Sequence, residues 1–252
     1  MVPAHSAQHR KLSVIIPVFN EEENLPLTAE GIFSVLGTDP DFLELVFIDD
    51  GSQDRTVEIA KQLMEREPRL RLVRHDKNRG LGAAIKTGLS SAEGDLVLYT
   101  DADLPFDFKL IPDLLALSKS NYIVIGCRQN RGEGGRRWIL TKSYNLITWL
   151  ALGVNVQDIN FACKLIPKRA IQGMKLQSDG SFIDAEILLE CRRLGYGIVE
   201  FPMKYFPRQF GQSTLSRPRV VFGIVKELIQ YLLRSASLPR YEIVEEIDPQ
   251  RR

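Results

Sequence analysis

The stretch Gly94–Asp107, GDLVLYTDADLPFD, joins an apolar run to two closely spaced carboxylates. The apolar residues form a short continuous run, which is typical of a strand covered on both faces. Asp101 and Asp103 follow the run directly, with Pro105 two residues further on. Two like charges this close repel each other, and neither gains by leaving water. The stretch therefore predicts a buried strand that ends at a site for a positively charged partner.

Four other apolar runs have the same character, and segments with helical spacing separate them. Strands are predicted within KLSVIIPVFN (11–20), LELVFIDDGS (43–52), LRLVRH (70–75) and YIVIGCR (122–128). Helices are predicted at Asn24–Leu36, Thr56–Glu67, Leu81–Ser91 and Phe108–Ser118. Strands that alternate with helices indicate an α/β protein with a doubly wound, mostly parallel sheet.

The carboxyl ends of parallel strands meet at one edge of a sheet, where ligands bind in such folds. The polar residues that follow the predicted strands are Asn20–Glu21, Asp49–Ser52, Asp101–Asp103 and Arg128. The fold class therefore predicts that these residues share one rim although they lie far apart in sequence.

After Arg128 the pattern changes, beginning with a glycine-rich loop at 131–135. The expected elements are a helix at 137–152, a strand within 158–167, a helix at 182–195, a strand within 197–208 and an amphipathic helix at 219–234. We divide the chain into a loose tail (1–10), one α/β domain (11–216), a C-terminal amphipathic helix (217–240) and a charged tail (241–252).

The chain has 252 residues with 33 basic and 32 acidic side chains, so its net charge is +1. A charge this close to zero and the lack of a recognised motif argue against a nucleic-acid partner. No run is long enough to span a bilayer, and the first residues lack the apolar core of a signal peptide. We expect a cytoplasmic protein, which could lie peripherally on the cytoplasmic face of a membrane.

Several kinds of site are disfavoured by the residues present. Cys127, Cys163 and Cys191 form no C-x-x-C pair, which argues against zinc and against a disulfide framework. With three histidines, two of them in the N-terminal tail, the chain offers no Ser-His-Asp or Cys-His set.

The acidic strand ends have two interpretations each. Asp101 and Asp103 suit Mg²⁺ or Mn²⁺, which prefer carboxylate oxygens and bind ligand phosphates as well, but they could also be solvated acids of a turn. Asp49 and Asp50 could accept hydrogen bonds from a base or a ribose, or could serve the turn that follows them.

Two further segments could bind phosphate. The glycine segment 78–88 fits neither a Walker loop nor the dinucleotide fingerprint, yet its backbone N–H groups could reach a phosphate or a base. Basic side chains in 128–142 and 204–219 are either solvated surface or a phosphate site, for which the guanidinium group is well shaped.

Four segments together resemble the GT-A-fold family 2 glycosyltransferases, in this order and spacing. They are VIIPVFNEEENL (14–25), VFIDDGSQDRT (46–56), NRGLGAAIKTGL (78–89) and YTDADLPF (99–106). Within that family the chain most resembles the dolichyl- or polyprenyl-phosphate mannose or glucose synthases, through DINFACKLI (158–166), FIDAEILL (182–189) and PRQFGQSTL (207–215). Ala162, Cys163 and Thr214 depart from the usual Gly, Phe and Lys of those segments.

The resemblance implies a role for each matching residue. The nucleotide sugar would contact Pro17, Phe19, Glu21, Asp49, Asp50, Gly82 and Asp101, with Asp50 at the base. Asp101 and Asp103 would hold Mg²⁺ or Mn²⁺, and both would count as catalytic together with Arg128 and Asp158. The acceptor phosphate would be bound by Arg128, Arg137, Thr141, Arg208 and Ser213.

The implied reaction moves a hexose from a GDP-mannose or UDP-glucose type donor to a lipid phosphate at a membrane surface, with inversion. An acceptor hydroxyl, on a soluble molecule or a glycan, would instead need a general base, and Asp158 or Asp184 would be the first candidates. A third interpretation is a non-catalytic binding protein of the same fold. The amphipathic helix could lie on a membrane or pack on the core. The sequence does not indicate an oligomeric state.

Overall fold

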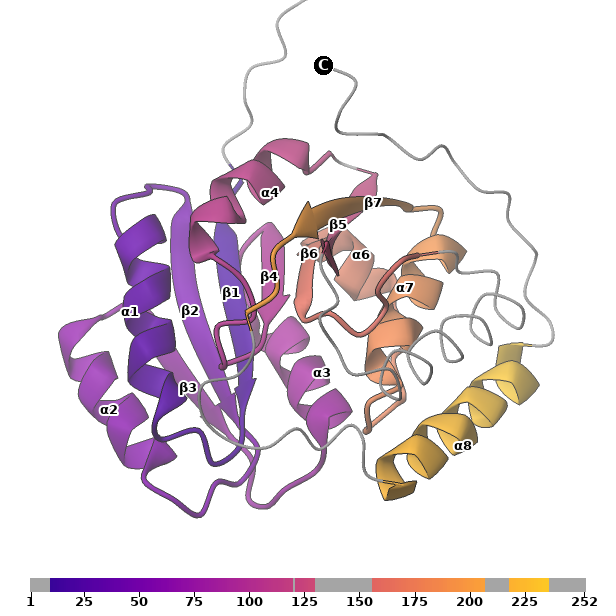
Figure 1. The fold of residues 1–252 in the computed structure, drawn as a ribbon, viewed down its shortest axis with the longest axis horizontal. Coiled ribbons are helices and arrows are strands. Elements are labelled where there is room, and N and C mark those ends of the chain that lie inside the picture. Colours follow the sequence, from indigo (N-terminus) through magenta and orange to yellow (C-terminus); the bar gives the residue numbers. More distant parts are fainter. Residues whose placement is uncertain (1–9, 120, 130–155, 207–217, 236–252) are drawn as a thin grey trace, which may run out of the picture.

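The computed structural model describes residues 10–119, 121–129, 156–206 and 218–235 (Figure 1). From the N-terminus, the elements are β1 (Leu12–Val18), α1 (Asn24–Leu36), β2 (Phe42–Asp49), α2 (Thr56–Arg66), β3 (Leu70–Arg74), α3 (Leu81–Ser91) and β4 (Leu96–Thr100). They are followed by the 3₁₀ turn η1 (Phe108–Leu110), α4 (Ile111–Leu117), β5 (Tyr122–Arg128), β6 (Cys163–Pro167), α6 (Lys168–Gly173), α7 (Ile183–Arg193), β7 (Gly197–Met203) and α8 (Pro218–Ser235).

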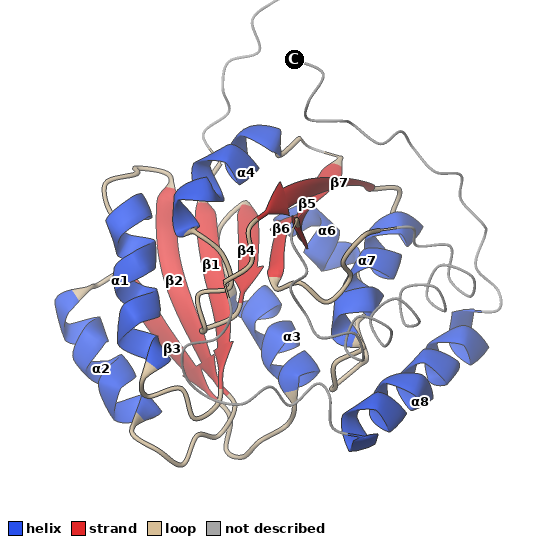
Figure 2. Cartoon of the chain, in the orientation of Figure 1, coloured by secondary structure: helices blue, strands red, loops and turns tan. Residues whose placement is uncertain are grey.

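The strands form one seven-stranded sheet in the order β3-β2-β1-β4-β6-β5-β7 (Figure 2). The first four strands in this order are parallel to one another, and β5 pairs in parallel with β7. Strand β6 lies between β4 and β5 and is antiparallel to both. The predicted mostly parallel α/β sheet is therefore confirmed, with one reversed strand, β6, inside it.

Helices cover both faces of the sheet (Figure 1), which explains why the strand sequences are continuously apolar. Helices α1, α2 and α4 pack on one face around residues such as Val14 and Phe47. Helices α3, α6 and α7 pack on the other face around residues such as Ile15 and Val46. Alternate residues of β1 and β2 thus belong to two separate cores.

Helix α8 packs on the second layer through one side only. Leu228 and Tyr231 are buried, and the ring of Tyr231 lies 5.9 Å from that of Phe182. Ile229 and Leu233 are 51% and 77% exposed. The interpretation that this helix packs on the core therefore holds for the side that carries Leu228 and Tyr231. In the part of the chain that the structure describes, none of the helices is both long and apolar enough to cross a membrane.

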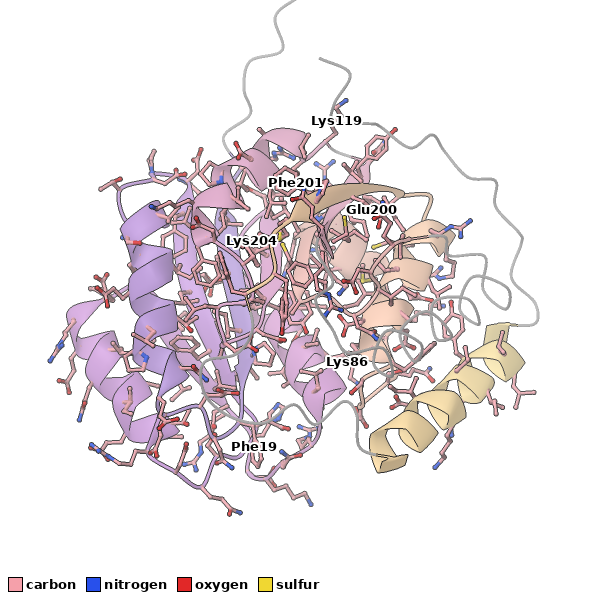
Figure 3. The ribbon with its side chains drawn as sticks, in the orientation of Figure 1. Phe19, Lys86, Lys119, Glu200, Phe201 and Lys204 are labelled. Atoms are coloured by element: carbon pink, nitrogen blue, oxygen red, sulfur yellow. The ribbon has the colours of Figure 1, made fainter. Side chains whose placement is uncertain are left out.

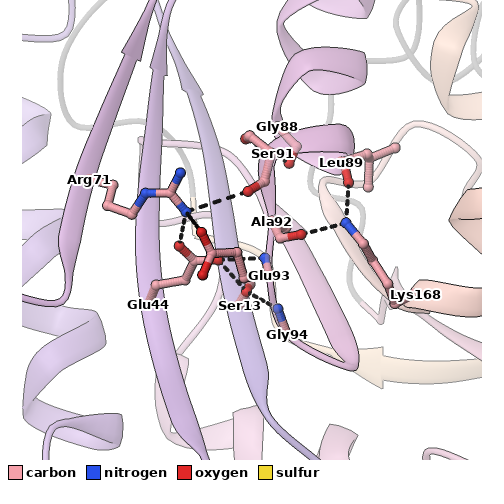
Figure 4. Close-up of polar contacts among 10 residues, drawn as sticks. All are labelled: Ser13, Glu44, Arg71, Gly88, Leu89, Ser91, Ala92, Glu93, Gly94 and Lys168. Atoms are coloured by element: carbon pink, nitrogen blue, oxygen red, sulfur yellow. Dashed lines mark hydrogen bonds and ion pairs between the residues drawn. The ribbon is translucent and has the colours of Figure 1, made fainter.

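Glu44 is a buried carboxylate near the amino ends of the strands, opposite to the rim predicted for ligands (Figure 4). Its Oε1 accepts hydrogen bonds from Ser13 Oγ at 2.6 Å and from the Glu93 backbone N–H at 2.7 Å, and Arg71 pairs with Oε2. The backbone N–H of Gly94 donates to Ser13 Oγ at 2.8 Å. This cluster ties β1, β2 and β3 to the turn before β4, and so fixes their register.

Candidate functional site

The carboxyl ends of β1, β2, β4 and β5 lie at one edge of the sheet, since among the described strands β6 alone runs the other way. The predicted site residues of 17–21, 49–50, 101–103 and 128 are therefore brought to this edge. The reversed direction of β6 also brings the residues that precede it, Asp158–Phe161, to the same edge. Topology thus assembles the rim from segments that are distant in sequence.

Asp49 and Asp50, at the end of β2, are both buried and bonded within the protein. Asp49 accepts from the Ser52 N–H at 3.0 Å and pairs with Arg74 at 3.1 Å. Asp50 accepts from the backbone N–H groups of Arg79 and Gly80 at 2.9 and 2.8 Å.

A histidine lies on the other side of the Asp50 carboxylate. Nδ1 of His75 is 2.6 Å from Asp50 Oδ1, and its Nε2 is 2.9 Å from Oγ1 of Thr87 on α3. Asp50 therefore fixes the loop between β3 and α3. Its predicted contact with the base stays a prediction.

The segment after β1 presents an aromatic ring to solvent. Phe19 is 41% exposed at the edge of the molecule (Figure 3), while Pro17 is half-buried. The backbone after it is fixed, since Asn20 has a φ of 56° and its N–H donates to Ser52 Oγ at 2.9 Å. Glu21 accepts from the Asn24 side chain at 2.6 Å at the start of α1. An exposed ring on a rigid turn is suited to stack on a nucleotide base.

Gly82 makes a close contact between backbones at the start of α3. Its N–H donates to the Asp179 carbonyl at 2.9 Å, and an added Cβ would lie 2.4 Å from the Ser178 carbonyl oxygen. Lys86 on α3 (Figure 3) pairs with Asp179 at 2.7 Å. Gly82 thus has a packing role here, and its predicted contact with the nucleotide is a separate prediction.

The segment 177–180 is also held from α7 and α8. Glu186 of α7 accepts from the Gln177 and Ser178 N–H groups at 3.0 and 2.8 Å. Glu227 of α8 accepts from the Gly180 N–H at 2.9 Å. Glu186, which belongs to the segment 182–189 that carries part of the family resemblance, is therefore bonded to the segment 177–180.

The Asp101–Asp103 turn has a constrained backbone. Thr28 of α1 donates to the Ala102 carbonyl between the two acids, and the Phe206 N–H donates to the Pro105 carbonyl at 3.0 Å. Leu104 has a φ of 51°, a left-handed conformation that costs about 1–2 kcal/mol in a residue with a side chain. Strain of this kind persists where the surrounding contacts fix the backbone, which is common at functional sites.

The donor set at this turn fits a hard divalent cation that also binds a ligand. Asp101 is half-buried and Asp103 is buried. Two carboxylates suffice for Mg²⁺ when substrate phosphates and water complete its coordination. No cluster of three or more metal-binding side chains occurs among the described residues. Nearby, Thr100 Oγ1 is buried without a hydrogen-bond partner within the described part of the chain.

Arg128 and Asp158 form a two-pronged ion pair on the other half of the rim. Nε and Nη2 of Arg128 lie 2.5 and 3.0 Å from the two carboxylate oxygens of Asp158; Asp158 is buried and the Arg128 side chain is 9% exposed. The guanidinium carbon also lies 5.2 Å from the ring centroid of Tyr205 and 5.9 Å from that of Phe161. The pair orients the guanidinium and neutralises Asp158.

A second buried ion pair lies beneath the rim. Nζ of Lys164, on β6, lies 2.5 Å from Oδ1 of Asp184, on α7, and 3.0 Å from the Phe161 carbonyl. Burial raises the pKa of the Asp184 carboxyl, and the charge of Lys164 opposes the rise. Burial likewise raises the pKa of the Cys163 thiol to about 12, so no thiolate nucleophile forms there.

The sequence missed two polar residues of the site, Lys164 and Tyr99. Lys164 lies in an otherwise apolar strand, where a charged residue signals a buried partner, and Tyr99 has a hydroxyl that seeks a partner when it is buried. Lys204, named only as part of a basic segment, is exposed just after β7 (Figure 3). The predicted acceptor residues Arg137, Thr141, Arg208 and Ser213 lie outside the described residues.

Comparison with protein families gives a match to the model described as "Glycosyl transferase family 2" over residues 13–174. The chain is 30% identical over 244 residues to a dolichol-phosphate mannosyltransferase of Pyrococcus furiosus, covering 91% of this chain and 66% of that one. It is 29% identical over 217 residues to an undecaprenyl-phosphate 4-deoxy-4-formamido-L-arabinose transferase of Photorhabdus laumondii, covering 85% of this chain and 66% of that one. It thus spans slightly less than two thirds of either relative.

Among solved structures, the fold is similar to glucosyl-3-phosphoglycerate synthase from Mycobacterium tuberculosis. The complex of that enzyme with Mn²⁺, UDP and glucosyl-3-phosphoglycerate matches with a TM-score of 0.68 and 23% identity, over 92% of this chain and 81% of that chain. Its complex with Mg²⁺ and UDP matches with a TM-score of 0.67 and 24% identity, over the same shares. These similarities identify the fold as GT-A.

Proposed function

Because the chain belongs to glycosyl transferase family 2, we propose that it moves a hexose from a nucleotide-diphosphate sugar to a polyprenyl or dolichyl phosphate. That the protein is a glycosyltransferase follows from the family. The lipid-phosphate acceptor is our proposal. It is supported by two relatives, one named for dolichol phosphate and the other for undecaprenyl phosphate.

The observation that carries the acceptor proposal is the state of two carboxylates, Asp158 and Asp184. A hydroxyl acceptor needs a base to take its proton, whereas a phosphate acceptor is already an anion. Asp158 is bound by Arg128 through both oxygens, and Asp184 is buried against Lys164. Both first candidates for a base are thus neutralised by a cation, which favours an acceptor that needs none.

On the donor side, we assign the metal to Asp101 and Asp103, with Phe19 stacking on the base. A divalent cation bound there would stabilise the negative charge that builds on the departing nucleoside diphosphate. The strained turn at Leu104 and the hydrogen bond from Thr28 hold the two carboxylates in place before the donor arrives.

On the acceptor side, we assign Arg128 to the incoming phosphate. Asp158, Tyr205 and Phe161 hold its guanidinium in one orientation, so that it need not reorganise during the reaction. Attack of the acceptor on the anomeric carbon from the side opposite the leaving group would invert that carbon. The membrane surface that carries such a lipid would be reached by the exposed side of α8, with Ile229 and Leu233.

The test offers two acceptors that differ only in the phosphate. The protein is incubated with Mn²⁺ and radiolabelled GDP-mannose, UDP-glucose or UDP-N-acetylglucosamine, together with either a polyprenyl phosphate or the matching polyprenol. We expect label in the organic phase from one donor, with the phosphate only, and none from an Asp103→Ala variant. Transfer to the polyprenol, or to neither lipid, would overturn the lipid-phosphate proposal.

A further inference from the structure

Tyr99 and Lys164 are opposite each other in the β4–β6 ladder, directly behind the Asp101–Asp103 turn. Tyr99 is the residue before the last of β4, and it is almost completely buried. Nζ of Lys164 lies 5.5 Å from the centroid of its ring. The antiparallel direction of β6 creates this pair, since it brings the start of β6 beside the end of β4.

Lys164 is held by fixed partners on the side away from Tyr99. Its ammonium donates to Oδ1 of Asp184 at 2.5 Å and to the Phe161 carbonyl at 3.0 Å. It is fully buried, so water does not compete for these bonds. The tyrosine ring therefore lies against a rigid cation and cannot tilt without losing that contact.

The hydroxyl of Tyr99 points back to the rim, where it donates to Oδ1 of Asp101 at 3.4 Å. A tyrosine hydroxyl carries its proton at neutral pH, so it is the donor in this contact and the Asp101 carboxylate is the acceptor. A buried tyrosine hydroxyl seeks such a partner, and a carboxylate that accepts one hydrogen bond presents its other lone pairs in a defined direction.

We propose that Tyr99, braced by Lys164, is a positioning residue that orients the Asp101 carboxylate toward the metal-bound diphosphate of the donor. The inference rests on the proposed role of Asp101 and goes beyond it, because it assigns the orientation to a buried residue that lies behind the turn. Partners of metal ligands typically change metal affinity by about 10- to 100-fold when they are removed.

The experiment titrates Mn²⁺ by calorimetry into the full chain saturated with UDP and, separately, with GDP. We expect Tyr99→Phe to weaken Mn²⁺ binding about 10-fold with the nucleotide that supports it, and Asp101→Asn to weaken it further. The matched control is Tyr122→Phe, which should bind Mn²⁺ as the wild type does. Tyr122 is partly buried and is the first residue of β5, at the end of that strand away from the rim. The melting temperature of each metal-free variant is measured alongside. A variant that is only destabilised would have a lower melting temperature without a selective loss of Mn²⁺ affinity.

The outcomes separate this inference from the proposed function. Wild-type Mn²⁺ affinity in Tyr99→Phe, with a loss in Asp101→Asn, would overturn the positioning role and leave the metal site standing. An Asp101→Asn variant that binds Mn²⁺ normally, or a wild-type protein that binds none with either nucleotide, would overturn the metal site and this inference together.

Discussion

The ammonium of Lys164 lies 2.5 Å from the carboxylate of Asp184, and both groups are buried between the sheet and α7. Taking two charges out of water is costly, and the attraction between them offsets that cost only when both are present. The pair is therefore weak support for stability as a whole, but the loss of one member would leave a bare buried charge.

Lys164→Met tests this asymmetry, because methionine fills similar space without the charge. We expect a loss of about 3–5 kcal/mol in the free energy of unfolding, measured by urea denaturation. The control is the double variant Lys164→Met/Asp184→Asn, which removes both charges and should recover most of the loss. Equal losses in the single and double variants would contradict the explanation.

The loss in Lys164→Met should depend on pH in a defined direction. Burial already raises the pKa of Asp184, and removing Lys164 withdraws the charge that opposes the rise. In the native variant Asp184 then keeps a proton that the unfolded chain releases near pH 4. The contribution of this group to native stability is therefore greatest at low pH and is lost as pH rises through its raised pKa. Urea unfolding at pH 8 and pH 5 should show a smaller gap to wild type at pH 5.

Much of the fold could be predicted because the signals are local. Helices α1 and α3 begin and end at the predicted residues, Asn24–Leu36 and Leu81–Ser91. The single helix predicted at Phe108–Ser118 is instead a 3₁₀ turn followed by α4 at Ile111–Leu117, with Pro112 in the first turn of α4. A proline lacks the N–H group that a continuous ladder requires, but it fits the start of a helix.

The candidate site could be predicted as a rim, but its internal pairing could not. Strand-end acids are visible in the sequence, and parallel topology brings them together. The direction of β6 depends on pairing with two strands distant in sequence, and no local pattern encodes it. The contacts of Lys164 with Tyr99 and of Arg128 with Asp158 follow from that reversed strand, so they became visible only in the structure.

Arg128→Lys should impair catalysis without weakening the donor complex. Lysine keeps the positive charge but cannot bind Asp158 in the two-pronged manner or stack as a plane on Tyr205. With the lipid phosphate as acceptor, we expect kcat/KM to fall about 100-fold, while the affinity for UDP or GDP with Mn²⁺ is unchanged.

Arg69→Lys is the matched control for Arg128→Lys. Arg69 also stacks on two rings, 5.7 Å from the centroid of Phe33 and 5.0 Å from that of Phe42, but it lies away from the rim. Its replacement should leave kcat/KM unaltered. A similar loss of activity in both variants would show that stacking serves stability and that Arg128 has no special role.

Glu44→Gln should lower stability and spare activity. The carboxylate accepts from Ser13 and Glu93 and pairs with Arg71 near the amino ends of the strands (Figure 4), where no site residue lies. Hydrogen bonds to a charged group contribute about 1.5–3 kcal/mol, so we expect a loss of that order in urea unfolding. Kinetics at a temperature where both proteins are folded should give kcat/KM within about 2-fold of wild type, since changes at distant positions without shared partners usually act independently. A large decrease in kcat/KM would contradict the view that the amino ends of the strands serve stability while the carboxyl ends carry the site.

Gly82→Ala should disturb the nucleotide half of the rim through packing alone. The new Cβ would lie 2.4 Å from the Ser178 carbonyl oxygen, and that segment is held by Glu186 and Glu227, so it cannot retreat freely. We expect a loss of about 1–3 kcal/mol in stability, as for other overpacked sites, together with weaker nucleotide binding. The second effect arises because the neighbouring Gly80 N–H is bonded to Asp50.

The control for Gly82→Ala is Gly223→Ala on α8, where an added Cβ meets nothing within 4 Å. Alanine is favoured over glycine in a helix by about 1 kcal/mol, so this variant should be slightly more stable and should bind nucleotide normally. Thermal unfolding with and without UDP or GDP and Mn²⁺ measures both quantities. If Gly82→Ala bound nucleotide more weakly without any loss of stability, the glycine would contact the nucleotide itself, as the family resemblance implies, and the packing explanation would fail.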